Sequence, residues 1–298
     1  MGVQFWWFYD VIVIAVAAIC IFITAKKGLL KASFAIVGYI FAVFLSYSGS
    51  AGIADTITEH AIRGSNIQKL HQTLVDYEYS SELAMKLEGL GYNLYVDRST
   101  LEEIYSKGED VDEKIYDYLN KINNKKVDEE DVFYEKLHNC YAESVKGLIS
   151  RQLTQYSAEC AAEEIRKDPA TFRQFLQIVS DPEHKEPGAV FLVDHYLMKP
   201  YRTYVRLIIY LIAFVLLLFL ALVIARAAAR HDHIEYNAMT YISCGIIGIA
   251  KAATIVLAIA VMIRLYVITG SNKMLFFNHD VIEKSYIFKY IYQIVQKW

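Results

Sequence analysis

Four long apolar runs constrain this chain more than any other feature. They lie at about 5–24, 30–47, 205–225 and 242–268. A helix rises about 1.5 Å per residue, so about 20 apolar residues are needed to cross a hydrocarbon core about 30 Å thick. Only helices and closed barrels satisfy every backbone polar group inside a bilayer. We therefore predict an all-α fold, a four-helix integral membrane protein whose first partner is the lipid bilayer.

The first apolar run differs from a cleaved secretory signal in the position of its charges. No Lys or Arg precedes it, whereas Lys26 and Lys27 follow it. A secretory signal has its basic residues ahead of the apolar stretch. We expect this run to remain as a membrane helix.

Charge divides the chain into two kinds of segment. Residues 50–204 contain 28 acids and 18 bases, a net charge of -10, and the remaining residues have a net charge of +7. The acidic excess argues against nucleic acid as a partner, because binding phosphates requires clustered positive charge. We predict four segments: two membrane helices in 1–48, an acidic helical domain inserted at 49–204, two membrane helices in 205–268, and an amphipathic tail at 269–298.

The inserted segment contains helix signals and few strand signals. Thr100 followed by Glu103 predicts a capping box at one helix start. Asp168 followed by Pro169 predicts an N-cap with proline in the first turn. A further helix is expected from about Asp128, because apolar residues recur there at helical spacing. They are Phe133, Leu137, Tyr141, Val145 and Leu148.

Basic residues in the two short loops predict the orientation. Lys26, Lys27 and Lys31 lie between the first two helices, and Arg226 and Arg230 lie between the last two. Because Lys and Arg in short loops favour the cytoplasmic side, we expect both loops to be cytoplasmic. Both termini and residues 49–204 are then extracytoplasmic. Bases beside the third helix, Lys199, Arg202 and Arg206, argue weakly for the opposite orientation.

Three charged residues lie within the apolar runs. An ionisable side chain in hydrocarbon costs several kcal/mol and normally acquires a partner or a hydrated cavity. Asp10 and Arg264 are expected at similar depths near the outer side, so we predict that they face each other or share a hydrated pocket. Lys251 lies nearer the cytoplasmic end, from which it can reach the headgroups. Anchoring and helix registration are the favoured roles of all three, with an ion or proton path as the alternative.

Small residues form stripes on two of the predicted helices. Gly38, Ala42 and Ser46 recur every four residues on the second helix, and Gly245, Gly248 and Ala252 recur on the fourth. Such stripes allow helix backbones to approach closely inside a membrane. They fit packing within one chain or in a homo-oligomer, and we favour the first.

The sequence contains no recognisable catalytic motif. We find no Gly-x-Ser-x-Gly, no phosphate-binding glycine loop and no His-Glu-x-x-His, so we expect no enzymatic activity and no cofactor. His231, Asp232 and His233 alternate without further ligands at motif spacing, and we interpret them as a solvated loop rather than a metal site. Cys140 and Cys160 are either a disulfide or two free thiols, and we favour free thiols.

Several of these residues resemble the colicin V production protein (CvpA) family. They are Asp10-Val-Ile-Val-Ile, the turn Lys26-Lys27-Gly28-Leu29, the small-residue second helix through Gly38, and Gly245-Ile-Ile-Gly248-Ile-Ala-Lys251-Ala252. The similarity covers roughly residues 5–60 and 205–268. This chain departs from the family pattern at Ile23-Thr24-Ala25 and at Ala252, where the family often has glycine. Its link between the second and third helices, over 150 residues, is also much longer than in compact members.

The resemblance implies a bacterial cytoplasmic membrane protein associated with toxin (bacteriocin) production and export or with envelope processes. It implies helix-packing roles for Gly28 and the other small residues. We expect a non-enzymatic scaffold or export accessory whose inserted domain contacts an envelope or secreted partner. A transporter or channel that uses Asp10, Lys251 and Arg264 is the first alternative. A membrane sensor with an extracytoplasmic ligand-binding domain is the second.

Overall fold

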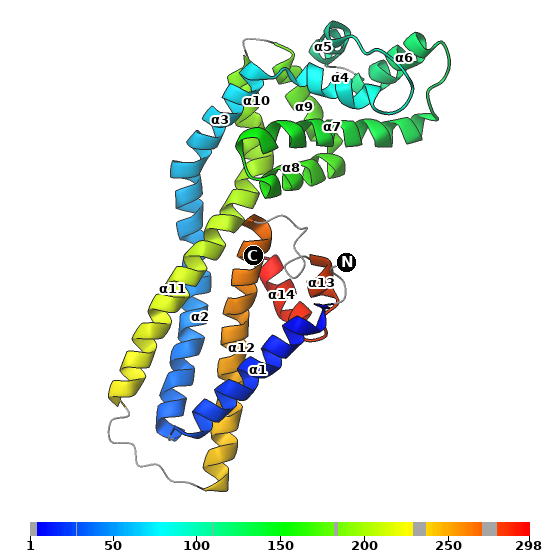
Figure 1. Cartoon of the computed structure of the whole chain (residues 1–298). Helices are drawn as coiled ribbons and strands as arrows, with labels where there is room; N and C mark the ends of the chain where they lie inside the picture. The colour runs from blue at the N-terminus through cyan, green and yellow to red at the C-terminus, as the bar shows by residue number, and fades with distance from the viewer. Residues whose placement is uncertain (1–4, 28, 109, 182–183, 229–236, 270–278) are drawn as a thin grey trace. The chain divides into compact units, whose positions relative to one another are not determined.

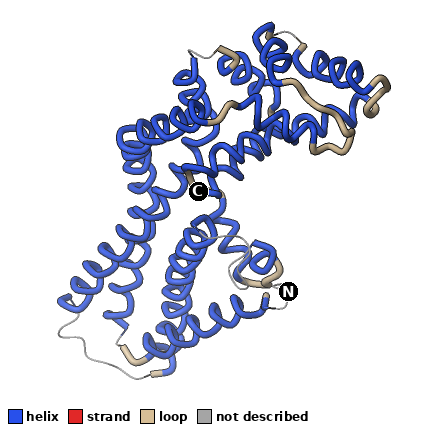
Figure 2. The backbone as a smooth tube through the Cα atoms, turned by 45° about the horizontal axis from the view of Figure 1, so that its top comes forward, coloured by secondary structure: helices blue, strands red, loops and turns tan. Residues whose placement is uncertain are grey.

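The computed structural model describes residues 5–27, 29–108, 110–181, 184–228, 237–269 and 279–298, and within these ranges it contains helices and no strands. The chain divides into two compact units, residues 1–56 with 202–298 and residues 57–201. Figure 2 shows helices joined by loops in both units. The predicted all-α fold is confirmed.

The first unit contains four helices that are long and apolar enough to cross a membrane. They are α1 (Trp7–Ala25), α2 (Leu29–Ile57), α11 (Met198–Ala228) and α12 (Ala238–Thr269). Helices α1 and α11 end, and α2 and α12 begin, at the same end of this unit (Figure 1). These helices support a multi-pass membrane protein.

Two pairs of helices in this unit approach each other closely at a glycine. A Cβ atom added at Gly248 of α12 would lie 2.7 Å from Cα of Ile21 in α1. One added at Gly38 of α2 would lie 2.5 Å from Cβ of Ala221 in α11. Real Cβ atoms do not approach other atoms this closely, so both crossings require glycine.

Two short helices complete the first unit. They are α13 (His279–Glu283) and α14 (Phe288–Gln296), and α14 packs against α12 and α1. Phe288, Tyr292 and Val295 form the buried face of α14, and the ring of Phe288 stacks on that of Tyr9 with centroids 5.0 Å apart. Within the predicted tail, α14 is therefore a helix packed on α1 and α12.

The second unit is a helical domain with its own apolar core. Its elements are η2 (Thr58–Ile62), α3 (Arg63–Asp76), α4 (Tyr79–Glu88), α5 (Arg98–Lys107), α6 (Val111–Asn123), α7 (Glu130–Gln152), α8 (Gln155–Lys167), α9 (Pro169–Val179), α10 (Lys185–Leu192) and η4 (Val193–Leu197). The core includes Leu137, Tyr141, Val145 and Leu148 of α7, as their helical spacing predicted.

The helix starts in this domain follow the sequence signals only in part. The side chain of Asp168 accepts a hydrogen bond from the backbone N–H of Thr171 at 3.1 Å, which confirms the predicted N-cap of α9. At α5 the N-cap is Asp97, which accepts a hydrogen bond from the backbone N–H of Thr100 at 3.0 Å. The predicted capping box at Thr100 is therefore wrong, because Asp97 caps the same turn three residues earlier.

The chain passes between the two units within helices. Residues 29–76 and 185–228 are each helical throughout, far longer than a bilayer requires. Each range contains one π-helical turn, η2 or η4. Beside these turns, Arg63 forms a bidentate ion pair with Asp194, with both N–O distances 2.7 Å.

Candidate functional site

Asp10 caps the C-terminal helix α14. Its carboxylate accepts three backbone N–H hydrogen bonds, from Tyr286 at 2.7 Å, Ile287 at 2.8 Å and Phe288 at 3.1 Å. The first N–H groups of a helix lack intrahelical partners, and the helix dipole favours a negative charge at that end. Asp10 is 8 % exposed, so its charge is compensated by these backbone groups inside the protein.

Arg264 lies at the opposite end of the same helix. One guanidinium nitrogen lies 3.4 Å from the carbonyl oxygen of Gln296, and the side chain also hydrogen-bonds Tyr292. A cation at a helix C-terminus is favourable for the same reason as an anion at the N-terminus. The nine residues of α14 span about 13 Å. Asp10 and Arg264 therefore bind opposite ends of α14 and do not pair directly, and the shared hydrated pocket stays a prediction.

Lys251 is the third charged residue of the membrane helices. It is 5 % exposed, and its ammonium lies 6.0 Å from the ring centroid of Tyr39. Among the described residues, no carboxylate lies within ion-pair distance of it. A buried lysine with an aromatic neighbour and no acidic partner is unusual in a membrane helix.

Only some residues of the two small-residue stripes lie at close contacts between helices. Gly38 and Gly248 form the two close crossings, and Ala42, Ser46 and Ala252 are buried. Gly245 has no heavy atom within 4 Å of the position of an added Cβ. Packing within the chain therefore requires glycine at Gly38 and Gly248 but not at Gly245.

The basic residues that predicted the orientation lie at one end of the first unit. Lys26, Lys27 and Lys31 flank the junction of α1 with α2, and exposed Arg226 is near the end of α11. Gly28, Arg230, His231, Asp232 and His233 lie outside the described residues. Within the described part of the chain, no group of three or more His, Cys, Asp or Glu residues is placed to hold a metal ion.

The helical domain contains a buried polar network that the sequence did not reveal. Asp112 of α6 accepts hydrogen bonds from Arg173 at 2.7 Å and from the Tyr141 hydroxyl at 3.0 Å, and His138 Nε2 lies 2.8 Å from it. Burial opposes ionisation of Asp112, but the His138 and Arg173 contacts outweigh it and lower its pKa. The network joins α6, α7 and α9.

A second buried carboxylate, Glu82 of α4, pairs with Arg151 of α7. The Arg151 guanidinium also lies 3.8 Å from the ring centroid of Tyr77. Glu82 is 7 % exposed, so its charge depends on this partner. Cys140 and Cys160 are not joined by a disulfide, and burial raises the pKa of Cys140 to about 11.

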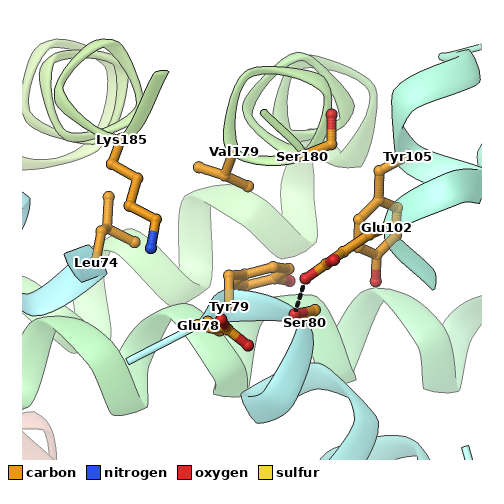
Figure 3. Close-up of a pocket in the computed structure, with 9 residues that line it drawn as sticks. All are labelled: Leu74, Glu78, Tyr79, Ser80, Glu102, Tyr105, Val179, Ser180 and Lys185. Atoms are coloured by element: carbon orange, nitrogen blue, oxygen red, sulfur yellow. Dashed lines mark hydrogen bonds between the residues drawn. The ribbon is translucent and has the colours of Figure 1, made fainter. Parts of the chain in front are cut away.

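The domain also contains a cavity of about 90 Å³ that is lined by residues from five helices and their ends. Figure 3 shows the side chains around it, which come from α3, α4, α5, α9, α10 and their ends. The Ser80 hydroxyl donates a hydrogen bond to Glu102 at 2.6 Å. The lining is Leu74, Glu78, Tyr79, Ser80, Glu102, Tyr105, Val179, Ser180 and Lys185.

Most of these features had no usable signal in the sequence. The cap on α14 joins residues 276 to 278 positions apart, and the cavity joins side chains from five helices. The Ser285 hydroxyl also accepts a hydrogen bond from the Lys289 N–H at 2.9 Å, although Ser285 lies before the N-cap residue of α14, Ile287.

The chain was compared with protein-family models, with curated proteins and with solved structures, and none of them matches. The resemblance to the CvpA family therefore depends on the residues quoted above.

Proposed function

We propose that this protein is a non-enzymatic membrane scaffold or export accessory of the CvpA type. In this proposal the four long helices anchor the chain in a bacterial cytoplasmic membrane. The helical domain at 57–201 contacts an envelope or secreted protein outside it, and its acidic charge favours a partner with a basic surface. The association of the resembled family with toxin production and export makes an exported toxin or its machinery the first partner to test.

The observation that carries this proposal is the set of hydrogen-bond partners of Asp10 and Arg264. A transport path requires charged groups that can exchange partners with an ion, a proton or a solute. Asp10 instead accepts three backbone hydrogen bonds, and Arg264 contacts the other end of the same helix. Both charges therefore stabilise the packing of α14 against α1 and α12, which is a structural role.

The orientation is tested by labelling single cysteines in intact cells. Lys126→Cys and Arg226→Cys, each in a cysteine-free background, place reporters at two exposed positions in different units. The proposal expects a membrane-impermeant maleimide to label position 126 directly and position 226 only after permeabilisation. The reverse pattern places the acidic domain in the cytoplasm and excludes an extracytoplasmic partner.

Lys251 favours a transporter as the second candidate, because it is buried without a described acidic partner. Purified protein in liposomes that contain a pH-sensitive dye measures proton flux under an imposed gradient. The scaffold proposal expects flux equal to that of protein-free liposomes. Flux that Lys251→Met abolishes establishes the transporter instead. Asp10→Asn is unsuitable for this test, since it also weakens the cap of α14.

A further inference from the structure

The cavity in the helical domain has opposite charges on opposite sides. Figure 3 shows the Lys185 side chain extending from α10 toward the space, and the Glu102 carboxylate directed toward it from α5. Glu78 and Ser80, at the start of α4, line the floor between them. The polar groups therefore present the Lys185 ammonium at one end, the Glu102 carboxylate at the other, and the Glu78 carboxylate between them.

The charges in this cavity are incompletely paired within the protein. Glu102 receives one hydrogen bond, from Ser80. Among the described residues, no carboxylate lies within ion-pair distance of the Lys185 ammonium, although the chain has an acidic excess in this region. Tyr105 is 1 % exposed and lines the same cavity, and its hydroxyl has no hydrogen-bond partner among the described residues. A buried hydroxyl without a partner is costly, and a bound polar molecule or water relieves that cost.

The volume sets the size of an occupant. A water molecule takes up about 30 Å³ in the liquid. A cavity of about 90 Å³ therefore has room for about three water-sized groups, such as an ammonium, a carboxylate and the short carbon chain between them. A small amino acid has this size, whereas a nucleotide, a peptide or a lipid headgroup with its chains does not.

We propose that this cavity binds a small zwitterion of the amino-acid class. The ammonium group of the ligand contacts Glu102, with Ser80 and Glu78 beside it, and its carboxylate contacts Lys185. The two glutamates outnumber the single lysine, so the cavity disfavours a simple anion. This binding site is independent of the scaffold role proposed above, and it gives the domain a chemical ligand that the scaffold role does not require.

The test measures binding of L-alanine and L-serine to the full-length protein in lipid nanodiscs by isothermal titration calorimetry. The proposal expects saturable binding of at least one of them below 10 mM, with about one ligand per chain. Lys185→Met and Glu102→Gln are each expected to weaken binding by about 10-fold or more, since each removes a charge-assisted hydrogen bond. Glu103→Gln is the matched control, because Glu103 is 66 % exposed and pairs with Lys107 outside the cavity.

Two truncated probes separate ligand recognition from a loss of folding. Ethylamine has the ammonium without the carboxylate, and propionate has the carboxylate without the ammonium. Lys185→Met is expected to leave ethylamine binding unchanged while it weakens L-alanine binding. Circular dichroism confirms that each variant remains helical. No saturable binding of either amino acid by the unmodified protein overturns the proposal, as does unchanged L-alanine binding by both variants.

Discussion

Removing the cap of α14 should release this helix while leaving the four long helices in place. Asp10→Ala leaves three backbone N–H groups, those of Tyr286, Ile287 and Phe288, without their acceptor. A hydrogen bond to a charged group contributes about 1.5 to 3 kcal/mol, and loss of an N-cap costs about 0.5 to 2 kcal/mol. Because headgroups or water can replace part of these bonds, we expect α14 to be destabilised by about 2 to 4 kcal/mol.

Asp10→Asn should have roughly half of this effect, for a geometric reason. Asp10 Oδ1 accepts the hydrogen bonds from Ile287 and Phe288, and Oδ2 accepts the one from Tyr286. An asparagine amide oxygen can keep the first two bonds, but its NH2 group then faces the N–H of Tyr286. It also removes the negative charge from the helix N-terminus. We expect a loss of about 1 to 2 kcal/mol.

Hydrogen exchange measured by mass spectrometry in nanodiscs tests both variants. Since about 1.4 kcal/mol corresponds to a tenfold change in an equilibrium, Asp10→Ala should accelerate exchange in α14 by about 30-fold to several hundred-fold. Glu283→Gln is the matched control, because it removes an exposed charge from the adjacent helix α13 without touching the cap. Unchanged α14 exchange in Asp10→Ala would refute the reasoning, and accelerated exchange throughout α1 and α12 would show that the effect is not local.

Three further outcomes follow from the structure. Gly248→Leu should destabilise the first unit by about 1 to 3 kcal/mol, because the added Cβ meets the backbone of Ile21, whereas Gly245→Leu should have little effect; thermal unfolding in nanodiscs compares them. Asp112 has a lowered pKa, so its stabilising contribution is present above about pH 4 and is lost as the pH falls through its folded-state value; Asp112→Asn should flatten the acid limb of the stability profile measured by circular dichroism. Arg151→Met leaves the buried charge of Glu82 unpaired and should cost about 3 kcal/mol in the same assay, whereas Lys107→Met, at an exposed ion pair, should cost less than about 1 kcal/mol.

Hydropathy predicted the four membrane helices, because it measures the property that a bilayer selects. It did not predict where these helices end. The apolar run ends at about residue 47, but the helix continues through residues 48–76, although this stretch includes Gly49, Gly52 and Gly64 and many polar residues of low helix propensity. Helix ends are determined by caps and packing, and only local caps such as Asp168 are visible in a sequence.

The charged residues of the long apolar helices show a second limit of prediction from sequence. Charged residues are rare in apolar runs, so the sequence correctly indicated that Asp10, Lys251 and Arg264 need an explanation. The predicted partner was another charge, because charges can be found in a sequence. The partner of Asp10 is instead a set of backbone N–H groups, which every residue except proline has, so no sequence pattern distinguishes Tyr286 to Phe288 from their neighbours.

The different surroundings of the three charged residues also determine which substitutions can test a transport function. Asp10 and Arg264 bind the two ends of one helix, so substitutions at either position alter the packing of α14 before they alter any path for an ion. Lys251 lies beside Tyr39 without a described acidic partner, and its removal leaves the cap intact. A loss of function in Asp10→Asn alone therefore indicates a structural role, whereas a loss in Lys251→Met with unchanged hydrogen exchange in α14 indicates a role for the charge itself.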